Sequence, residues 1–300
     1  MKTEKNVLML SAAGGLFFAV LGLTWGIIIQ SSMIMFDGLY SLISLFISIL
    51  AICISNFIQK KDFEKFPFGK GIIEPITVAF QSIVLFVMCS LSLLNGIKEL
   101  VSGGNSINTG LALGYSIISS IGCTFVYLLM KKKGKRLSSD IIRAESNQWL
   151  MDTILSVAVF AGFIISVILG LTSFAYLTRY VDSLMVIITS AVFIKLPVKT
   201  LIRSFKEIVN STASKEINDK IYTIVKNIED EYKFENSVTR VSKIGRELRI
   251  EIDFVFNSNS ILNELEEMDK VREQVSTNMK GIKLEKWLNV NFTGDRKWAV

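Results

Sequence analysis

Residues 31–44 read SSMIMFDGLYSLIS, and they place one carboxylate, Asp37, inside an apolar run that continues to about residue 57. Placing an aspartate at the middle of a bilayer costs about 2.5–3.5 kcal/mol on insertion scales, so such a residue usually faces a polar interior and handles an ion or a proton. Asp152 lies in a second stretch of this kind. These two acids therefore indicate a protein that transports an ion or a proton across a membrane.

The other apolar residues also come in blocks of about 20, the length that crosses about 30 Å of hydrocarbon. Half of the 300 residues are hydrophobic. We expect six spans, over residues 7–29, 33–57, 73–97, 109–130, 146–170 and 180–202. The first block is too long for a signal peptide and a second block follows it directly, so a retained helix is expected. The chain is predicted to be a multi-pass integral membrane protein.

Basic residues mark every second connection between these spans. They are Lys2 and Lys5, then Lys60, Lys61, Lys65 and Lys70, then Lys131, Lys132, Lys133, Lys135, Arg136 and Arg143, and finally Arg203 and Lys206. By the positive-inside rule, both termini are expected in the cytoplasm, with the spans in a cell (inner) membrane. Most of the net charge of +6 therefore reflects topology, and no nucleic-acid partner is expected.

From residue 204 onward the composition is that of a water-soluble domain. Apolar residues recur at helical spacing from Ile217 to Ile228 and from Ile261 to Val275. They alternate with polar residues over 248–256 and 288–292, and a turn at Gly245 suggests a further strand over 237–244. The order helix, strand, strand, helix, strand predicts a small α+β domain. We therefore expect a transmembrane domain over residues 1–206 and a cytoplasmic domain over residues 207–300.

Two polar stripes run along the predicted spans. The second span carries Asp37, Tyr40, Ser41, Ser44 and Ser48, and the fifth carries Glu145, Gln148, Asp152 and Ser156. Steps of three and four place each set on one helix face. Because the two spans run in opposite directions, the stripes can face each other and form a polar pathway. The serines also fit helix packing and Asp37 fits a structural cap, whereas the apolar turns after Asp152 favour function.

These stretches resemble the cation diffusion facilitator family. Residues from Ser31 to Ser44 are similar to the family's second span, where a small polar pair and an apolar run precede Asp-Gly-Leu-His-Ser-Leu-Ser-Asp. The loop Pro67-Phe68-Gly69, with Glu74 after it, is similar to the family's connection between spans two and three. The resemblance implies six spans with both ends inside, a ferredoxin-like αββαβ tail and a homodimer.

The resemblance also implies a metal site. Family members hold a divalent metal, often zinc, between four side chains that correspond here to Tyr40, Ser44, Gln148 and Asp152, and Asp37 lies one turn from Tyr40. The chain has no histidine, so the imidazole ligands that suit zinc are missing. Oxygen donors suit harder ions. The transported cation is expected among Mn²⁺, Mg²⁺, Fe²⁺ and Zn²⁺, with weak affinity for zinc, and no bound cofactor is expected.

The implied function is secondary active efflux of a divalent metal, by proton antiport and alternating access. Two alternatives stay open: a carrier of another ion, such as a monovalent cation, or a degenerate scaffold that pairs with an active relative. An enzyme is not expected, because the Gly-x-Gly-Asp context of intramembrane aspartyl proteases is absent. Trp149, beside Gln148, is interpreted as an interfacial anchor.

Overall fold

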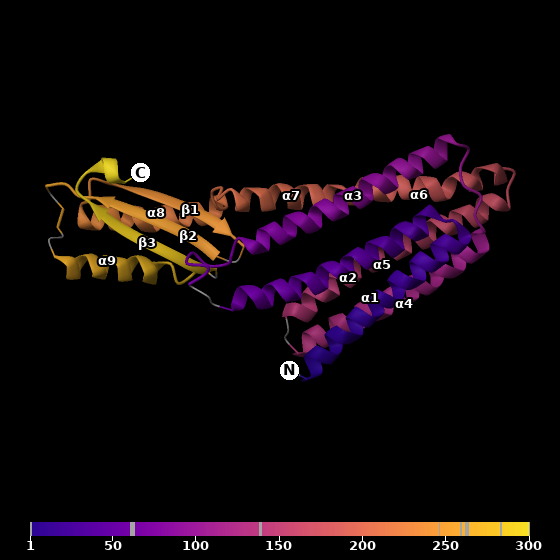
Figure 1. Ribbon diagram of the computed structural model, residues 1–300, viewed down its shortest axis with the longest axis horizontal. Coiled ribbons are helices and arrows are strands. Elements are labelled where there is room, and N and C mark those ends of the chain that lie inside the picture. The colour runs from indigo at the N-terminus through magenta and orange to yellow at the C-terminus, as the bar shows by residue number, and fades with distance from the viewer. Residues whose placement is uncertain are drawn as a thin grey trace. The chain divides into compact units, whose positions relative to one another are not determined.

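The computed structural model describes residues 2–60, 64–137, 140–245, 247–258, 260–261, 264–282 and 284–299 (Figure 1). The chain divides into two compact units. The first consists of Met1–Cys53 and Gln81–Lys199, and the second of Ile54–Phe80 and Thr200–Val300. The first unit is helical, and the second contains the sheet.

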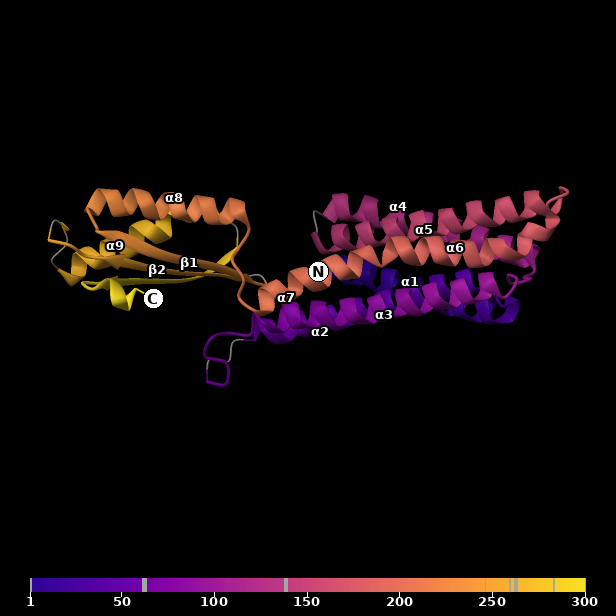
Figure 2. The ribbon, with the colours of Figure 1, turned by 90° about the horizontal axis from the view of Figure 1, so that it is seen from above.

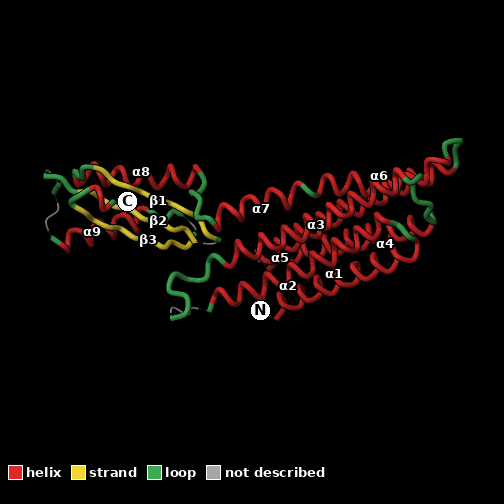
Figure 3. Tube along the Cα trace, turned by 45° about the horizontal axis from the view of Figure 1, so that its top comes forward, coloured by secondary structure: helices red, strands yellow, loops and turns green. Residues whose placement is uncertain are grey.

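Long apolar helices make up the membrane part of the chain (Figure 3). They are α1 (Lys2–Ile29), α2 (Ser32–Gln59), α3 (Ile73–Val101), α4 (Thr109–Leu137), α5 (Asp140–Gly170), α6 (Thr178–Phe193) and α7 (Lys195–Ile208). Within the described ranges, six helical stretches are long and apolar enough to span a bilayer, α6 and α7 together forming the sixth. The six predicted spans are confirmed. Helices α1, α4 and α5 extend beyond the expected ends into charged sequence, because helical hydrogen bonds satisfy the backbone in lipid and in water alike.

The sixth span is broken into two helices near Pro197. Proline has no amide hydrogen, and its ring crowds the carbonyl four residues earlier, which belongs to Phe193, the last residue of α6. The turn falls at Ile194, and α7 begins at Lys195.

Helices α1 and α2 cross closely at glycines. A Cβ added at Gly38 would lie 2.6 Å from the backbone nitrogen of Leu23 and 2.7 Å from the carbonyl carbon of Gly22. One turn further along α1, a Cβ at Gly26 would lie 2.8 Å from the backbone nitrogen of Met35. Glycine has no Cβ, and such small residues allow the backbones of two membrane helices to come into contact. The crossing fixes α2 at the residue that follows Asp37.

Small polar residues join α4 to α5, which lie against each other in the bundle. The hydroxyl oxygens of Ser119 and Ser156 lie 2.9 Å apart, and Ser120 Oγ donates to the carbonyl of Ser156 at 2.9 Å. Ser156 lies one turn after Asp152 on α5. These contacts therefore hold the helix face that carries Asp152.

The second unit contains a three-stranded sheet with two helices. Its elements are α8 (Lys215–Tyr232), β1 (Asn236–Ile244), β2 (Glu247–Val255), α9 (Leu265–Asn278) and β3 (Glu285–Thr293). This order confirms the predicted αββαβ arrangement. Strand β2 is central, antiparallel to β1 with Ile250 opposite Val241, and parallel to β3 with Ile250 opposite Leu288. Helices α8 and α9 cover one face of the sheet (Figure 2). The alternating apolar residues of β2 pack against them.

Two charged side chains connect other parts of the second unit. Glu207, near the end of α7, accepts hydrogen bonds from Lys243 Nζ at 2.9 Å and from the backbone nitrogen of Gly245 at 3.0 Å. Lys70 is only 8% exposed and donates to the carbonyl of Lys60 at 2.8 Å, with its Nζ 4.2 Å from the ring centroid of Phe57. The contacts of Glu207 hold the end of α7, and those of Lys70 hold the end of α2.

Candidate functional site

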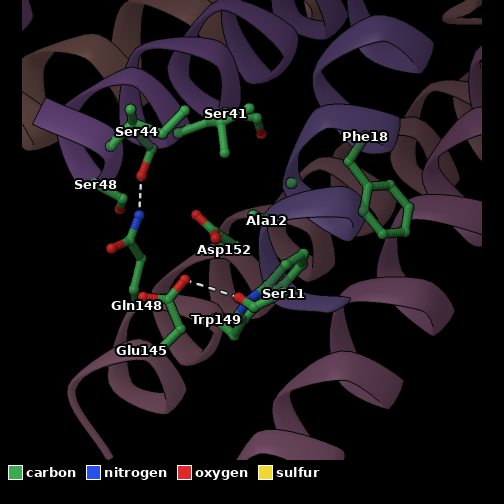
Figure 4. Close-up of a pocket in the computed structure, with 13 residues that line it drawn as sticks. Ser11, Ala12, Phe18, Ser41, Ser44, Ser48, Glu145, Gln148, Trp149 and Asp152 are labelled. Carbon is green, nitrogen blue, oxygen red and sulfur yellow. Dashed lines mark hydrogen bonds between the residues drawn. The ribbon is translucent and has the colours of Figure 1, made fainter. Parts of the chain in front are cut away.

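A cavity of about 80 Å³ lies between α1, α2 and α5 (Figure 4). Its polar walls come from Ser41, Ser44 and Ser48 on α2 and from Glu145, Gln148 and Asp152 on α5. The two sets belong to the stripes found in the sequence, and the structure places them face to face as predicted. The helical spacing thus indicated which polar side chains share this cavity, and its role as a pathway stays a prediction.

Asp152 points into this cavity, between the α2 serines and α1 (Figure 4). Its Oδ1 atom is buried and accepts no hydrogen bond from the described residues. A buried carboxylate oxygen without a donor is costly in an apolar surrounding. An oxygen of this kind, directed into a polar cavity, is suited to a proton or to a metal cation.

Gln148 and Ser44 connect the two walls directly. The side-chain amide of Gln148 donates a hydrogen bond to Ser44 Oγ across the gap between α5 and α2. Gln148, Ser44 and Asp152 are three of the four positions that the family resemblance assigned to metal binding. The structure brings these three side chains together at one cavity.

The other two candidate ligands, Tyr40 and Asp37, are not among the described residues that line the cavity. Asp37 is 5% exposed and accepts a hydrogen bond from the Tyr115 hydroxyl of α4 at 2.7 Å. The ring of Tyr40 packs edge-on against Phe193, with centroids 5.3 Å apart, and stacks on Phe36. As metal ligands, both residues stay predictions; in this structure Asp37 has a protein partner and Tyr40 an aromatic one.

A chain of hydrogen bonds closes the α1 side of the cavity. The indole nitrogen of Trp149 donates to Ser11 Oγ at 2.7 Å, and Ser11 Oγ donates to Glu145 Oε1 at 2.7 Å. Trp149 is only 4% exposed, so the interpretation of this residue as an interfacial anchor is wrong. Its ring packs against Phe18, and its indole N–H has a partner inside the bundle, as buried tryptophans usually do. Ser11 carried no signal in the sequence, since α1 has no polar stripe.

A separate polar cluster ties α2, α3 and α6 together away from the cavity. Asp182, 1% exposed, accepts from Ser31 Oγ at 2.6 Å and from the backbone nitrogen of Ser32 at 2.8 Å. Glu99 of α3 accepts from Ser183 Oγ at 3.2 Å. Both acids thus hold neighbouring helices by hydrogen bonds to neutral donors.

The groups in the cavity wall that could bind a cation are oxygen donors and the amide of Gln148. Cys89 and Cys123 are buried and Cys53 is exposed, and none of the three lines it. In the described ranges, no group of three or more acidic or cysteine side chains forms a metal cluster. The cavity therefore offers two carboxylates, several hydroxyls and an amide, which are donors of the hard type.

Comparisons with known proteins agree with this arrangement. A family model described as the cation efflux transmembrane domain matches residues 8–209, the part of the chain that contains the cavity. The manganese efflux system protein MneP of Bacillus subtilis (strain 168) is 24% identical over 213 residues, which cover 71% of this chain and 69% of that protein. Because the family match covers more than half of the chain, this protein belongs to the cation efflux family of membrane transporters and is a distant homologue of a manganese efflux protein.

Proposed function

We propose that this protein exports a divalent metal cation, with Mn²⁺ as its substrate, through the cavity at Asp152. The observation that carries the proposal is the buried Oδ1 of Asp152, which has no hydrogen-bond donor among the described residues and faces hydroxyl and amide groups of α2 and α5. A cation supplies what this oxygen lacks. Intramembrane acids in such positions mark ion pathways.

The choice of manganese rests on the donor set and on a relative. Oxygen ligands suit Mn²⁺ and Mg²⁺, whereas zinc sites use imidazole and thiolate, and this chain has no histidine and no cysteine at the cavity. MneP, the homologue from Bacillus subtilis, is a manganese efflux protein. Both considerations favour Mn²⁺ over Zn²⁺.

Transport follows an alternating-access cycle with proton exchange. In the inward-open state the cation binds Asp152 together with Gln148 and Ser44, and in the outward-open state a proton takes its place on the carboxylate. Asp152 can serve both ions because either one neutralises its charge. The metal then leaves the cell in exchange for protons that enter it.

The orientation of the carrier and its assembly belong to the same proposal. Both termini and the domain over residues 207–300 lie in the cytoplasm, as the alternation of basic connections supports. Labelling of introduced cysteines from outside the cell tests this: Ser102→Cys should react and Lys133→Cys should not. A homodimer is proposed from the family resemblance, and light scattering of the purified protein measures its mass.

The test is manganese flux in liposomes that contain the full-length protein and a manganese-quenched dye. Asp152→Asn should abolish Mn²⁺ transport, whereas Asp219→Asn, which neutralises an exposed acid of α8, should leave it unchanged. Equal transport by wild type and Asp152→Asn for Mn²⁺, Mg²⁺, Fe²⁺ and Zn²⁺ would refute the proposal. A wild-type protein that moves none of these ions, and that copurifies with an active relative, would favour the scaffold alternative.

A further inference from the structure

The cavity has to balance two positive charges, and Asp152 supplies only one negative charge. A dication in a low-dielectric interior is poorly compensated by a single carboxylate. Gln148 and the serines of α2 add dipoles but no charge. A second acid is therefore needed wherever the dication rests.

Glu145 is the other acid in the cavity wall. It lies seven residues before Asp152 on α5, which places both carboxylates on the same helix face, two turns apart. The described lining residues include no lysine or arginine, so none of them offers a positive charge to these two carboxylates. In Figure 4 the side chains of Glu145, Gln148 and Asp152 lie near one another, across from Ser41 and Ser44.

The hydrogen bonds around Glu145 fix its orientation. An indole N–H can only donate, so Ser11 Oγ must accept from Trp149 and direct its own hydrogen to Glu145 Oε1. Ser11 is buried, and its hydroxyl is therefore held between two fixed partners. This arrangement holds Glu145 Oε1 in place at the cavity wall, where it accepts a hydrogen bond from a neutral donor.

We infer that Glu145 is a second acidic ligand of the transported cation and supplies the charge that makes the site selective for divalent over monovalent ions. This inference rests on the proposed function of the Asp152 cavity. A volume of about 80 Å³ accommodates an ion with a few of its waters, since about 10–15 Å³ of volume measured in this way is enough for one water. Ions such as Mn²⁺ and Mg²⁺ keep part of their hydration shell in protein sites.

A purely structural role for Glu145 makes a different prediction. If Glu145 only clamps α1 to α5 through Ser11, then Glu145→Gln should behave like wild type, because the amide oxygen still accepts the Ser11 hydrogen. If its charge holds the cation, the same substitution should weaken Mn²⁺ binding although the hydrogen bond remains. The two roles are thus separated by one isosteric change.

The experiment measures Mn²⁺ flux and its concentration dependence in liposomes for wild type, Glu145→Gln, Glu145→Asp and Asp152→Asn. We expect Glu145→Gln to raise the apparent KM for Mn²⁺ by about 10- to 100-fold, since it removes one of the two negative charges that face the dication. Glu145→Asp, which keeps the charge, should restore most of the affinity. Asp219→Asn serves again as the control. Electron paramagnetic resonance of Mn²⁺ with the purified protein measures binding without transport.

Two results would overturn the inference. The first is a KM for Glu145→Gln within about twofold of wild type, a change too small for a lost charge, while Asp152→Asn is inactive; the proposed function then stands without Glu145. The second is an equal loss in Glu145→Asp and Glu145→Gln, which indicates a shape requirement instead of a charge requirement. Should Glu145→Gln not fold, Glu145→Ser is the second neutral variant and is judged by the same ratio. Failure of the proposed function itself is recognised by wild-type flux in Asp152→Asn.

Discussion

Replacing Gly38 with alanine tests whether the close crossing of α1 and α2 positions the cavity wall. The new Cβ would lie 2.6 Å from the nitrogen of Leu23 and 2.7 Å from the carbonyl carbon of Gly22, where carbon contacts prefer about 3.5–4.0 Å. Both neighbours are backbone atoms, so no change of rotamer relieves the overlap. Helix α2 must move away from α1, and Ser41 and Ser44 move with it.

The size of the effect follows from a matched pair of variants. Gly114 of α4 also lies early in a membrane helix, but a Cβ added there meets no atom within 4 Å. Alanine gains about 1 kcal/mol of helix propensity at either position. Only Gly38→Ala adds the cost of overpacking, about 1–3 kcal/mol. The difference between the two variants therefore measures the crossing alone.

The assays are thermal unfolding of the purified protein in detergent and Mn²⁺ flux in liposomes. Gly38→Ala should unfold at a lower temperature than Gly114→Ala and should transport more slowly, because the α2 wall no longer faces Asp152 in the same register. If the two variants have equal unfolding temperatures and equal flux, the crossing does not constrain the cavity, and the reasoning is refuted.

Two further substitutions probe the second unit. Lys70→Met should lower the unfolding temperature, with a loss of about 1–3 kcal/mol, because it removes the donor to the carbonyl of Lys60 inside a nearly buried site; Lys70→Arg is the comparison, and unchanged unfolding of Lys70→Met would contradict this role. Glu207→Gln should cost about 1–2 kcal/mol at low salt, since Lys243 loses its charged partner. The difference from wild type should shrink at high salt, and a deficit that is independent of salt would contradict an ionic contribution.

Most of the fold could be predicted from periodicity. Blocks of apolar residues gave the six spans, and alternating residues such as Ile250 and Ile252 gave the central strand, because burial on one face imposes these periods directly. The ends of the helices could not be predicted to the residue, since charged sequence continues α5 back to Asp140. The break at Ile194 has a local cause in Pro197, but whether proline kinks or breaks a helix depends on its neighbours.

The candidate site was predictable where it follows one helix face and unpredictable where it depends on packing. Gln148 and Asp152 share a stripe on α5, so their meeting with α2 could be expected. Ser11 stands alone among apolar residues of α1, and only the folded bundle brings it to Glu145. Trp149 is an aromatic residue near the end of a span, as interfacial anchors are, yet its position within the bundle buries it.

If Asp152 is the proposed cation ligand, its Oδ1, which accepts no hydrogen bond from the described residues, would also limit leakage. A buried carboxylate oxygen without a donor is least stable when the group is charged and holds no ion. On the proposed mechanism, the change between the inward-open and outward-open states would be easy only for a carrier loaded with metal or with a proton. Strict exchange, one ion out for others in, would follow from the electrostatics of a single side chain without any additional lock.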